Sequence, residues 1–461
     1  RTRKMKNLTL ENITKACKGV YHGDESKLDR EVGGVVIDSR KVQKDYLFVA
    51  IDGENVNAHQ FSPDTIEKGA LCVISHEDLG DTDFSYILVE STGQALLDIA
   101  KLYRDSFDVK VVGITGSVGK TSTKEMIASV VAQKYKVHKT IGNFNNEWGL
   151  PLTIFEMNEE HQVAILEMGV NHFGEMRRLS SVASPDICVI TNIGVAHLEF
   201  FKTREGILQE KSKMIQDMKD GGTIIFNGDD DLLSQAGPIK GATPILFGLG
   251  DNCQFYADNI QPMGLRGTSC TIHLPDESSF ECVVPLPGTH MISNALAGAA
   301  VGYTLHLTSE EIKAGIEGLP SIPGRNNIIK TDRLIILDDC YNANPVSMKA
   351  AIDVLDMAIG RKVAVLGNMG ELGNNEKVLH REVGEYAAAH GIDLVCGIGH
   401  LAKELVDGAT NGSSSTRGLW FENKADFLDA MKDPIKDGDN VLVKASQGMD
   451  LTTIVEALKN R

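Results

Sequence analysis

The stretch VKVVGITGSVGKTSTKEM, residues 109–126, decides the fold of the region around it. An apolar run ends in glycines, and a lysine, two hydroxyl residues and a helix-period segment over 120–133 follow, which predicts a buried strand, a tight turn and a helix. Glycines let backbone N–H groups approach a phosphate, and a helix N-terminus favours an anion. We expect Lys120 to reach terminal phosphates and the Thr121 hydroxyl to contact Mg²⁺. The spacing GxxGxxGKT departs from GxxxxGK[ST], so the prediction rests on strand, turn, lysine and helix occurring together.

Strand-like runs recur on both sides of this stretch with helix-length segments between them, which favours a mostly parallel sheet covered by helices. Residues 254–286 alternate in polarity and predict antiparallel strands, while LPSIPGRNN at 319–327 predicts a linker. We therefore expect an α/β protein of three domains. They are a smaller N-terminal α/β domain at 1–107, a central P-loop mononucleotide-binding domain with a parallel sheet at 108–325, and a C-terminal Rossmann-like α/β domain at 326–461.

Composition limits the class of protein. With 461 residues, 42% of them hydrophobic and 24% charged, the chain can bury real cores and is not predominantly disordered. Lys and Arg number 46 against 63 Asp and Glu, a net charge of −17, which excludes nucleic-acid or membrane binding by bulk charge. No apolar run reaches the ~20 residues of a membrane span, and the basic N-terminus lacks the apolar core of a secretory signal. Eight scattered cysteines without a CxxC pair indicate reduced thiols and a cytoplasmic protein.

Polar side chains follow the neighbouring strand-like runs. Glu167 ends the run VAILE, so we expect it at the same sheet edge as the glycine loop, where a carboxylate suits Mg²⁺; a simple ion pair is the alternative. His197 follows the next run, and Lys211 and Lys213 lie in the helical pattern after it. Taken alone, these would be a structural histidine and solvated lysines. The segment TIGNFNNEWGLP, residues 140–151, predicts a polar loop.

In this order, the motifs resemble the Mur ligase family, whose members form amide bonds with ATP in the synthesis of peptidoglycan precursors. The resemblance covers all three predicted domains. Within the family it is nearest to the branch that joins D-alanyl-D-alanine to UDP-N-acetylmuramoyl-tripeptide, on the segments IDSRKVQKDYLFVAIDGENVNAHQF (37–61), DDCYNANPVSM (338–348) and LGNMGELG (366–373). The resemblance implies an ATP-dependent ligase working through an acyl phosphate, with UDP-MurNAc-pentapeptide, ADP and phosphate as products. It also implies a monomer without nucleic-acid or membrane partners.

Matched position by position, the resemblance also implies site residues. The loop around the ATP phosphates would be Gly116, Ser117, Val118, Gly119, Lys120, Thr121 and Ser122, with Asn294, Arg325 and Asp339 holding the rest of the nucleotide. Two Mg²⁺ ions would be bound by Thr121, Glu167, His197 and Lys211, the lysine being carbamylated by CO₂; Lys120, Glu167, His197 and Lys211 would form the catalytic set. The UDP-sugar-peptide would contact Ser39 and Arg40 in the N-terminal domain and Asn145 and Asn146 in the central one, while the C-terminal domain would bind the acceptor dipeptide.

Three positions differ from the family pattern. Met291 replaces an asparagine, LVKASQ at 442–447 replaces LVKGSR, and Gly367-Asn368-Met369 replaces a GDM-type turn. Two other functions stay open: a P-loop nucleotide switch, and another Mur-type ligase that adds an amino acid or polyglutamate. Release of phosphate without further substrates would favour the switch, and failure of the first domain to bind a uridine nucleotide would favour the other ligase. Meso-diaminopimelate and lysine both stay open as the third residue of the tripeptide.

Overall fold

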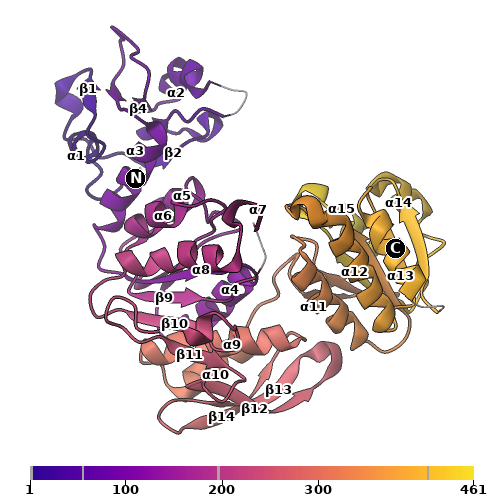
Figure 1. Ribbon diagram of the computed structural model, residues 1–461. Helices are drawn as coiled ribbons and strands as arrows, with labels where there is room; N and C mark the ends of the chain where they lie inside the picture. The colour runs from indigo at the N-terminus through magenta and orange to yellow at the C-terminus, as the bar shows by residue number, and fades with distance from the viewer. Residues whose placement is uncertain (1–3, 54–56, 195–197, 413–414) are drawn as a thin grey trace.

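The computed structural model describes residues 4–53, 57–194, 198–412 and 415–461. Within these residues three α/β units follow one another along the chain, each with its own sheet, of five, nine and six strands (Figure 1). This agrees with the fold class predicted from the sequence. In the same described part of the chain, no helix is long and apolar enough to cross a membrane.

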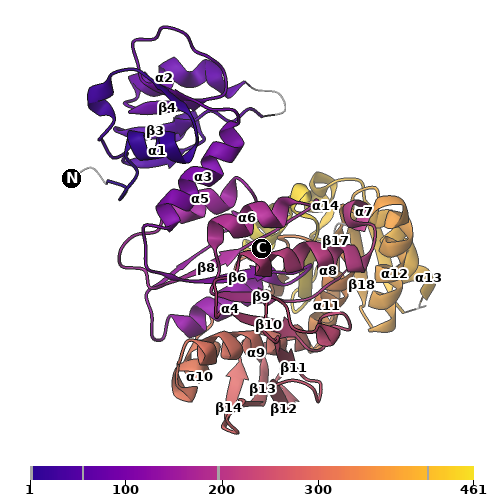
Figure 2. The same cartoon turned by 60° about the vertical axis from the view of Figure 1, so that its left-hand side comes forward.

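The N-terminal sheet has the order β1-β5-β4-β3-β2, with β1 antiparallel to β5 and the other pairs parallel. Its elements are α1 (Leu10–Ala16), β1 (Val20–His22), β2 (Gly34–Val36), β3 (Tyr46–Val49), α2 (Ser62–Glu67), β4 (Cys72–Ser75), β5 (Tyr86–Leu88) and α3 (Thr92–Arg104). Helix α3 also packs on the central domain, as Figure 2 shows. Tyr103 Oη donates to the Met157 carbonyl (2.8 Å) and Arg104 Nε to that of Ala183 (3.0 Å), which fixes the N-terminal domain against the central one.

The central sheet has the order β14-β13-β12-β11-β10-β9-β6-β8-β7 and is parallel from β7 to β12. Strands β12 to β14 are antiparallel, as the alternating pattern of 254–286 predicts. The strands are β6 (Lys110–Thr115), β7 (Val137–Lys139), β8 (Val163–Glu167), β9 (Ile187–Ile190), β10 (Thr223–Asn227), β11 (Ile245–Gly248), β12 (Phe255–Pro262), β13 (Thr268–His273) and β14 (Ser279–Val284). The helices are α4 (Lys120–Val131), α5 (Gly149–Phe155), α6 (Glu175–Ala183), α7 (Leu198–Phe201), α8 (Arg204–Ser212), α9 (Thr289–Thr304) and α10 (Ser309–Glu317).

Helix α9, which is far away in the sequence, packs on α4, the helix that follows the phosphate loop. Helix α9 packs closely on α4 because it carries glycines at the contact: a Cβ on Gly298 would lie 3.1 Å from Met126, and one on Gly302 would lie 2.8 Å from Val130. Helix α4 ends at Val131, two residues before the predicted end, because the turn beyond it tightens to i→i−3 hydrogen bonds.

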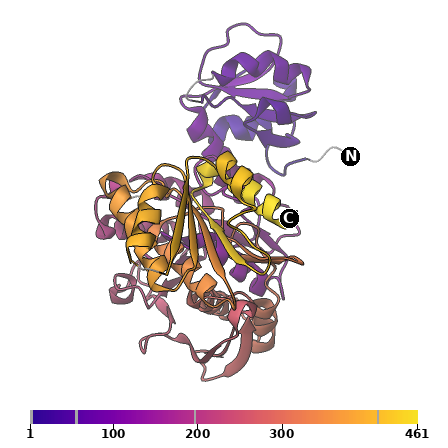
Figure 3. The ribbon, with the colours of Figure 1, turned by 90° about the vertical axis from the view of Figure 1, so that its right-hand side faces the viewer.

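The C-terminal sheet has the order β15-β16-β20-β17-β18-β19, parallel except for β15. Its strands are β15 (Asn327–Lys330), β16 (Ile335–Asp338), β17 (Lys362–Gly367), β18 (Leu394–Ile398), β19 (Arg417–Phe421) and β20 (Asn440–Lys444), and its helices are α11 (Pro345–Asp356), α12 (Glu376–Ala389), α13 (Ala402–Gly412), α14 (Lys424–Ala430) and α15 (Thr452–Lys459). Helices lie on both sides of this sheet (Figure 3). Along β17, Val363 and Val365 join one apolar core while Ala364 and Leu366 join the other, so both faces are buried.

Candidate active site

Two glycines shape the loop between β6 and α4. Gly116 has a φ of +156°, and a Cβ there would lie 1.9 Å from Thr191 Oγ1, so a larger residue does not fit. Gly119 has a φ of +78° and precedes the first residue of α4, Lys120. Lys120 Nζ donates to the Gly116 carbonyl at 2.9 Å. Burial lowers the pKa of Lys120, although the nearby Glu167 opposes this shift. The loop therefore presents a cation and a helix N-terminus together, which suits a polyphosphate.

The carboxylate of Glu167 lies beside this loop because β8 pairs in parallel with β6. Its Oε2 accepts a hydrogen bond from Thr121 Oγ1 (2.9 Å) and its Oε1 accepts one from Asn145 Nδ2 (2.8 Å). The side chain is only 2% exposed. The carboxylate of Glu167 and the hydroxyl of Thr121 supply oxygen ligands of the kind that Mg²⁺ prefers, so these two residues fit a magnesium ion.

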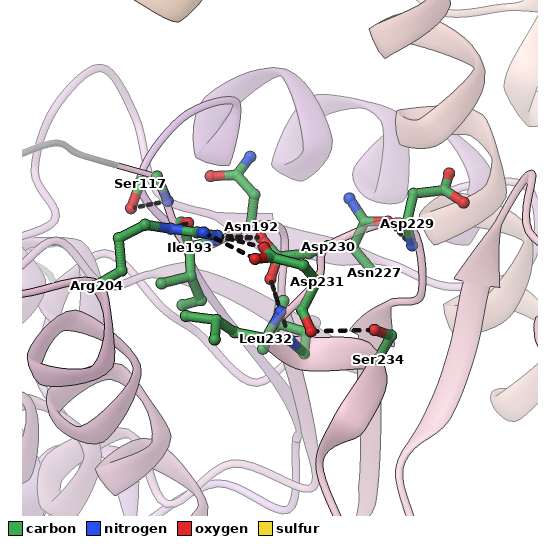
Figure 4. A network of polar contacts seen from close by, with 12 residues as sticks. Ser117, Asn192, Ile193, Arg204, Asn227, Asp229, Asp230, Asp231, Leu232 and Ser234 are labelled. Carbon is green, nitrogen blue, oxygen red and sulfur yellow. Dashed lines mark hydrogen bonds and ion pairs between the residues drawn. The ribbon is translucent and has the colours of Figure 1, made fainter.

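The segment after β9 is held against the phosphate loop, as Figure 4 shows. Asn192 accepts the Val118 N–H at Oδ1 and donates from Nδ2 to the Val118 carbonyl, both at 2.9 Å. From the other side, Asp230 Oδ2 accepts the Ile193 N–H (2.7 Å) and Arg204 Nε donates to the Ile193 carbonyl (2.9 Å). These contacts tie the start of the segment to both the phosphate loop and the loop after β10.

Lys211 is buried in α8, with 2% of the residue exposed. Burial lowers the pKa of its amine well below the ordinary value, and the charge of Lys120 lowers it further, while Glu210 opposes both. A lowered pKa favours the neutral amine, which is the nucleophilic form. Glu210 accepts two backbone N–H groups at the start of α6, at 2.9 and 3.0 Å, so the region around Lys211 is firmly held. His197, the other predicted ligand from this region, lies outside the described residues.

A cavity of about 730 Å³ opens between the central and C-terminal domains. The predicted residues that line it are Ser117, Val118, Gly119, Lys120, Thr121, Ser122, Asn145, Asn146, Glu167, Asn294, Arg325 and Asp339. Gly116 and Lys211 do not line it. Ser39 and Arg40 do not line it either: they lie in the N-terminal domain, where the 84% exposed Arg40 pairs with Asp38. The structure thus gathers at the cavity the predicted nucleotide residues other than Gly116 and leaves the predicted uridine contacts apart from them.

The C-terminal side of the cavity carries charged groups from the segment before β15, from the segment after β16 and from the end of β20. The guanidinium of Arg325 lies 3.9 Å from the centroid of the Tyr341 ring, a cation–π contact. Asp339 accepts the Asn326 N–H (2.9 Å) and pairs with Lys444. The phosphate loop and these groups therefore face one cavity from two domains.

Asn294 is held by its neighbours on both sides of its amide. Its Oδ1 accepts from Thr123 Oγ1 (2.9 Å), and its Nδ2 donates to the Met291 sulfur (3.4 Å). Met291, which differs from the family pattern, is thus buried and orients Asn294. His290 lines the same cavity; burial lowers its pKa, while the carboxylate of Asp339 opposes the shift.

Sequence reasoning did not single out Lys124, Thr140, Tyr341 or Lys444, all of which lie in or beside this site. For Lys124 a signal existed, because it stands four residues after Lys120 and therefore shares a helix face with it. For the other three, the sequence carried no local signal that separates them from ordinary loop and strand residues.

The comparisons with known proteins cover the whole chain. The Mur ligase middle domain matches residues 114–302, the Mur ligase glutamate ligase domain matches 324–447, and the domain described as Mur ligase family, catalytic domain, matches 31–103. The UDP-N-acetylmuramoyl-tripeptide--D-alanyl-D-alanine ligase of Bacillus subtilis (strain 168) is 37% identical over 455 residues, 98% of this chain and 98% of that protein. This chain belongs to the Mur ligase family.

Solved structures share the three-domain α/β fold of this Mur ligase. A crystal structure of MurF from Acinetobacter baumannii superposes with a TM-score of 0.90 at 29% identity, covering 99% of this chain and 100% of that one. The MurF ligase from Thermotoga maritima in complex with ADP gives a TM-score of 0.83 at 29% identity, covering 93% and 97%. The fold class predicted from the sequence is therefore confirmed.

A polar cluster in the N-terminal domain of this Mur ligase joins Asp52, His59, His76 and Glu77, with one ligand-type atom of each within 4.8 Å of the others. His59 Nε2 lies 3.3 Å from the backbone nitrogen of His76, and its Nδ1 lies 3.3 Å from Asp52 Oδ1. Because a backbone N–H can only donate, Nε2 accepts and the ring proton is on Nδ1. Nδ1 carries the proton and Nε2 accepts a hydrogen bond, so neither ring nitrogen has a free lone pair for a metal. We therefore assign this cluster a structural role, in which its hydrogen bonds connect the neighbouring loops.

Proposed function

We propose that this Mur ligase joins D-alanyl-D-alanine to UDP-N-acetylmuramoyl-tripeptide with ATP, giving the UDP-MurNAc-pentapeptide, ADP and phosphate. The observation that carries the proposal is the full-length similarity to the Bacillus subtilis ligase of that name, together with a phosphate loop facing a cavity between two domains. The similarity to the Thermotoga maritima MurF structure with ADP supports ATP as the nucleotide.

The chemistry requires an activated acyl group, because amine attack on a carboxylate would have to expel oxide. The terminal carboxylate of the tripeptide attacks the γ-phosphorus of ATP, the bond to the β-phosphate oxygen breaks, and ADP leaves. The dipeptide amine then attacks the acyl phosphate, and the tetrahedral intermediate collapses to the amide with release of phosphate and a proton. Positioning and electrostatic stabilisation of the transferred phosphoryl group supply most of the catalysis in such reactions.

Residues of the chain divide this work. Gly116, Ser117, Val118, Gly119 and Ser122 hold the phosphates through the loop backbone, and Lys120 neutralises charge on the transferred group. Thr121, Glu167, His197 and a carbamylated Lys211 would hold two Mg²⁺ ions, which when bound supply further positive charge to the phosphates. Asn294, Arg325 and Asp339 orient the nucleotide. The guanidinium of Arg325, which stacks on Tyr341, lies on the C-terminal wall of the cavity.

The remaining assignments concern whole domains. The N-terminal domain, 1–107, binds the UDP-sugar-peptide through Ser39 and Arg40, and Asn145 and Asn146 of the central domain, 108–325, contact its muramyl portion. The C-terminal domain, 326–461, binds the acceptor dipeptide. The enzyme acts as a monomer, with no nucleic-acid or membrane partner.

Phosphate release from ATP and Mg²⁺, with each substrate omitted in turn, tests the function. We expect release that needs both UDP-N-acetylmuramoyl-tripeptide and D-alanyl-D-alanine, with the pentapeptide product identified by its mass. Comparing tripeptides that carry meso-diaminopimelate and lysine assigns the third residue. Release that ignores the dipeptide would overturn the acceptor, and release without either substrate would favour a nucleotide switch. A product that carries added glutamate in place of the dipeptide would favour a polyglutamate-adding ligase.

A further inference from the structure

Lys124 is a buried lysine that the reaction described above does not use. It lies on α4, one turn after the phosphate loop, with 1% of its side chain exposed. Its Nζ donates to the Thr140 carbonyl at 2.6 Å and lies 3.1 Å from Glu125 Oε1 and 4.0 Å from Glu167 Oε2. Burying an ammonium group is unfavourable unless it is paired, so these contacts account for its position in the fold.

The partners of Lys124 belong to three separate segments of the chain. Thr140 follows β7, and its Oγ1 accepts the backbone N–H of Glu167 at 2.9 Å, at the end of β8. The loop that begins at Thr140 carries Asn145, whose Nδ2 donates to Glu167 Oε1 at 2.8 Å. One ammonium group therefore joins the phosphate-loop helix to the carboxylate of Glu167 and to the start of the asparagine loop.

We propose that Lys124 is a positioning residue that couples the metal–nucleotide site to the loop that receives the muramyl substrate. The inference rests on the proposed function for the roles of Glu167 and Asn145. Lys124 holds the Thr140 carbonyl directly and attracts the Glu167 carboxylate, so the two sides of the site keep a fixed spacing. Without its ammonium group, the phosphate-loop helix loses its link to the Thr140 carbonyl and to Glu167, and only the Thr140 Oγ1 and Asn145 Nδ2 hydrogen bonds still hold Glu167 to the loop.

The substitution Lys124→Met keeps the length of the side chain and removes its charge and donors. Loss of a group that orients a metal ligand commonly costs 10- to 100-fold in affinity or activity. We expect the gain in ADP affinity on adding Mg²⁺, measured by calorimetry, to fall about 10- to 100-fold, while ADP affinity in EDTA is unchanged. The KM for UDP-N-acetylmuramoyl-tripeptide should rise and that for D-alanyl-D-alanine should stay the same.

Three further variants make the test specific. Lys124→Arg restores a buried cation and should recover most of the Mg²⁺ effect. Lys134→Met is the matched control, because Lys134 is exposed just beyond the same helix and donates to the His306 carbonyl, away from Glu167. Thr140→Val removes only the hydroxyl that accepts the Glu167 N–H and should give a loss of about five-fold in the same two constants. This last variant tests the same linkage even if Lys124→Met does not fold.

Each outcome is decisive. An unchanged Mg²⁺ effect in a folded Lys124→Met, or in Thr140→Val if Lys124→Met does not fold, would overturn the positioning role, as would an equal rise in the KM of all three substrates. A wild-type enzyme that makes no pentapeptide would overturn the proposed function instead, and the calorimetric comparison of ADP with and without Mg²⁺ would still measure the coupling. The selective loss with rescue by arginine would support the proposal.

Discussion

Lowering the pH should destabilise one turn of the C-terminal domain, because protonation of His380 breaks a hydrogen bond to that turn. This histidine is fully buried in α12. Its Nδ1 bonds to the Glu376 carbonyl (2.6 Å), so Nδ1 donates, and its Nε2 accepts the Met369 N–H (2.8 Å). A second proton, on Nε2, would face that N–H, and burial lowers the pKa of His380. Met369 belongs to the turn after β17, which is tied to Ser446 through hydrogen bonds to the Asn368 carbonyl.

The sign of the effect follows from proton binding. Since the pKa of His380 in the folded chain lies below the value of about 6.5 for an unfolded histidine, the unfolded chain binds more protons below that pH. The free energy of unfolding is therefore lowered as the pH falls from about 6.5 toward the folded pKa, by at most about 1.4 kcal/mol per pH unit. The total is set by the difference between the folded and unfolded pKa values, to which burial of the ring contributes most and the lost Met369 N–H hydrogen bond adds.

Urea unfolding followed by tryptophan fluorescence can isolate this domain. The chain has two tryptophans, and in a Trp148→Phe background the remaining Trp420 reports on the C-terminal sheet, where its Nε1 donates to the Gly399 carbonyl (2.8 Å). We expect His380→Phe to lower the free energy of unfolding by about 1–3 kcal/mol at neutral pH. In the parent, the free energy of unfolding should fall as the pH is lowered below about 6.5. The part of that fall that His380 causes should be absent in the variant.

The exposed His400 in the same domain provides the control. It is the smallest of the causes that lower the pKa of His380, so His400→Gln should leave the stability at neutral pH unchanged and keep most of its pH dependence. If the parent and His380→Phe lost stability in parallel between neutral pH and about pH 5, the hydrogen-bond reasoning would be refuted.

Two further predictions concern Lys211 beside the phosphate loop and Arg325 in the cavity. Lys211→Ala should reduce the rate of phosphate release by about 10²–10³-fold, since it removes a preorganised charged group, and a short-chain carboxylic acid should restore part of it; full activity in the variant would exclude the carbamate. Arg325→Met keeps the length of the side chain but removes the cation 3.9 Å from the Tyr341 ring, which should raise the KM for ATP about five-fold without altering the KM for the dipeptide. An unchanged KM for ATP in that variant would exclude a role for the stack in nucleotide binding.

Local pattern was enough to predict the phosphate loop and the place of Glu167. The glycines at 116 and 119 have backbone conformations that other residues rarely adopt, so their positions in the sequence specify the turn. Glu167 ends a run of apolar residues, and parallel strands end at one edge of a sheet, so the sequence predicts that Glu167 lies at the same edge as the loop. Both inferences use only interactions within a few residues and the general geometry of parallel sheets.

The contacts of Lys124 and Arg325 could not be predicted in this way. Lys124 is expected on a solvated helix face until Thr140 and Glu167 fold over it, and only tertiary packing makes it a buried cation with three partners. Arg325 lies in the predicted linker, and the linker sequence alone does not predict that its guanidinium stacks on Tyr341.

By itself, the sequence determined the α/β class, the phosphate loop and the resemblance to the Mur ligases, because these depend on periodicity, glycine conformation and motif order. Only the tertiary structure decided which side chains meet at Glu167, which groups close the cavity from the C-terminal domain, and that Ser39 and Arg40 lie apart from it. The reason is physical: contacts between residues far apart in the chain depend on how whole elements pack, and no local pattern specifies that packing.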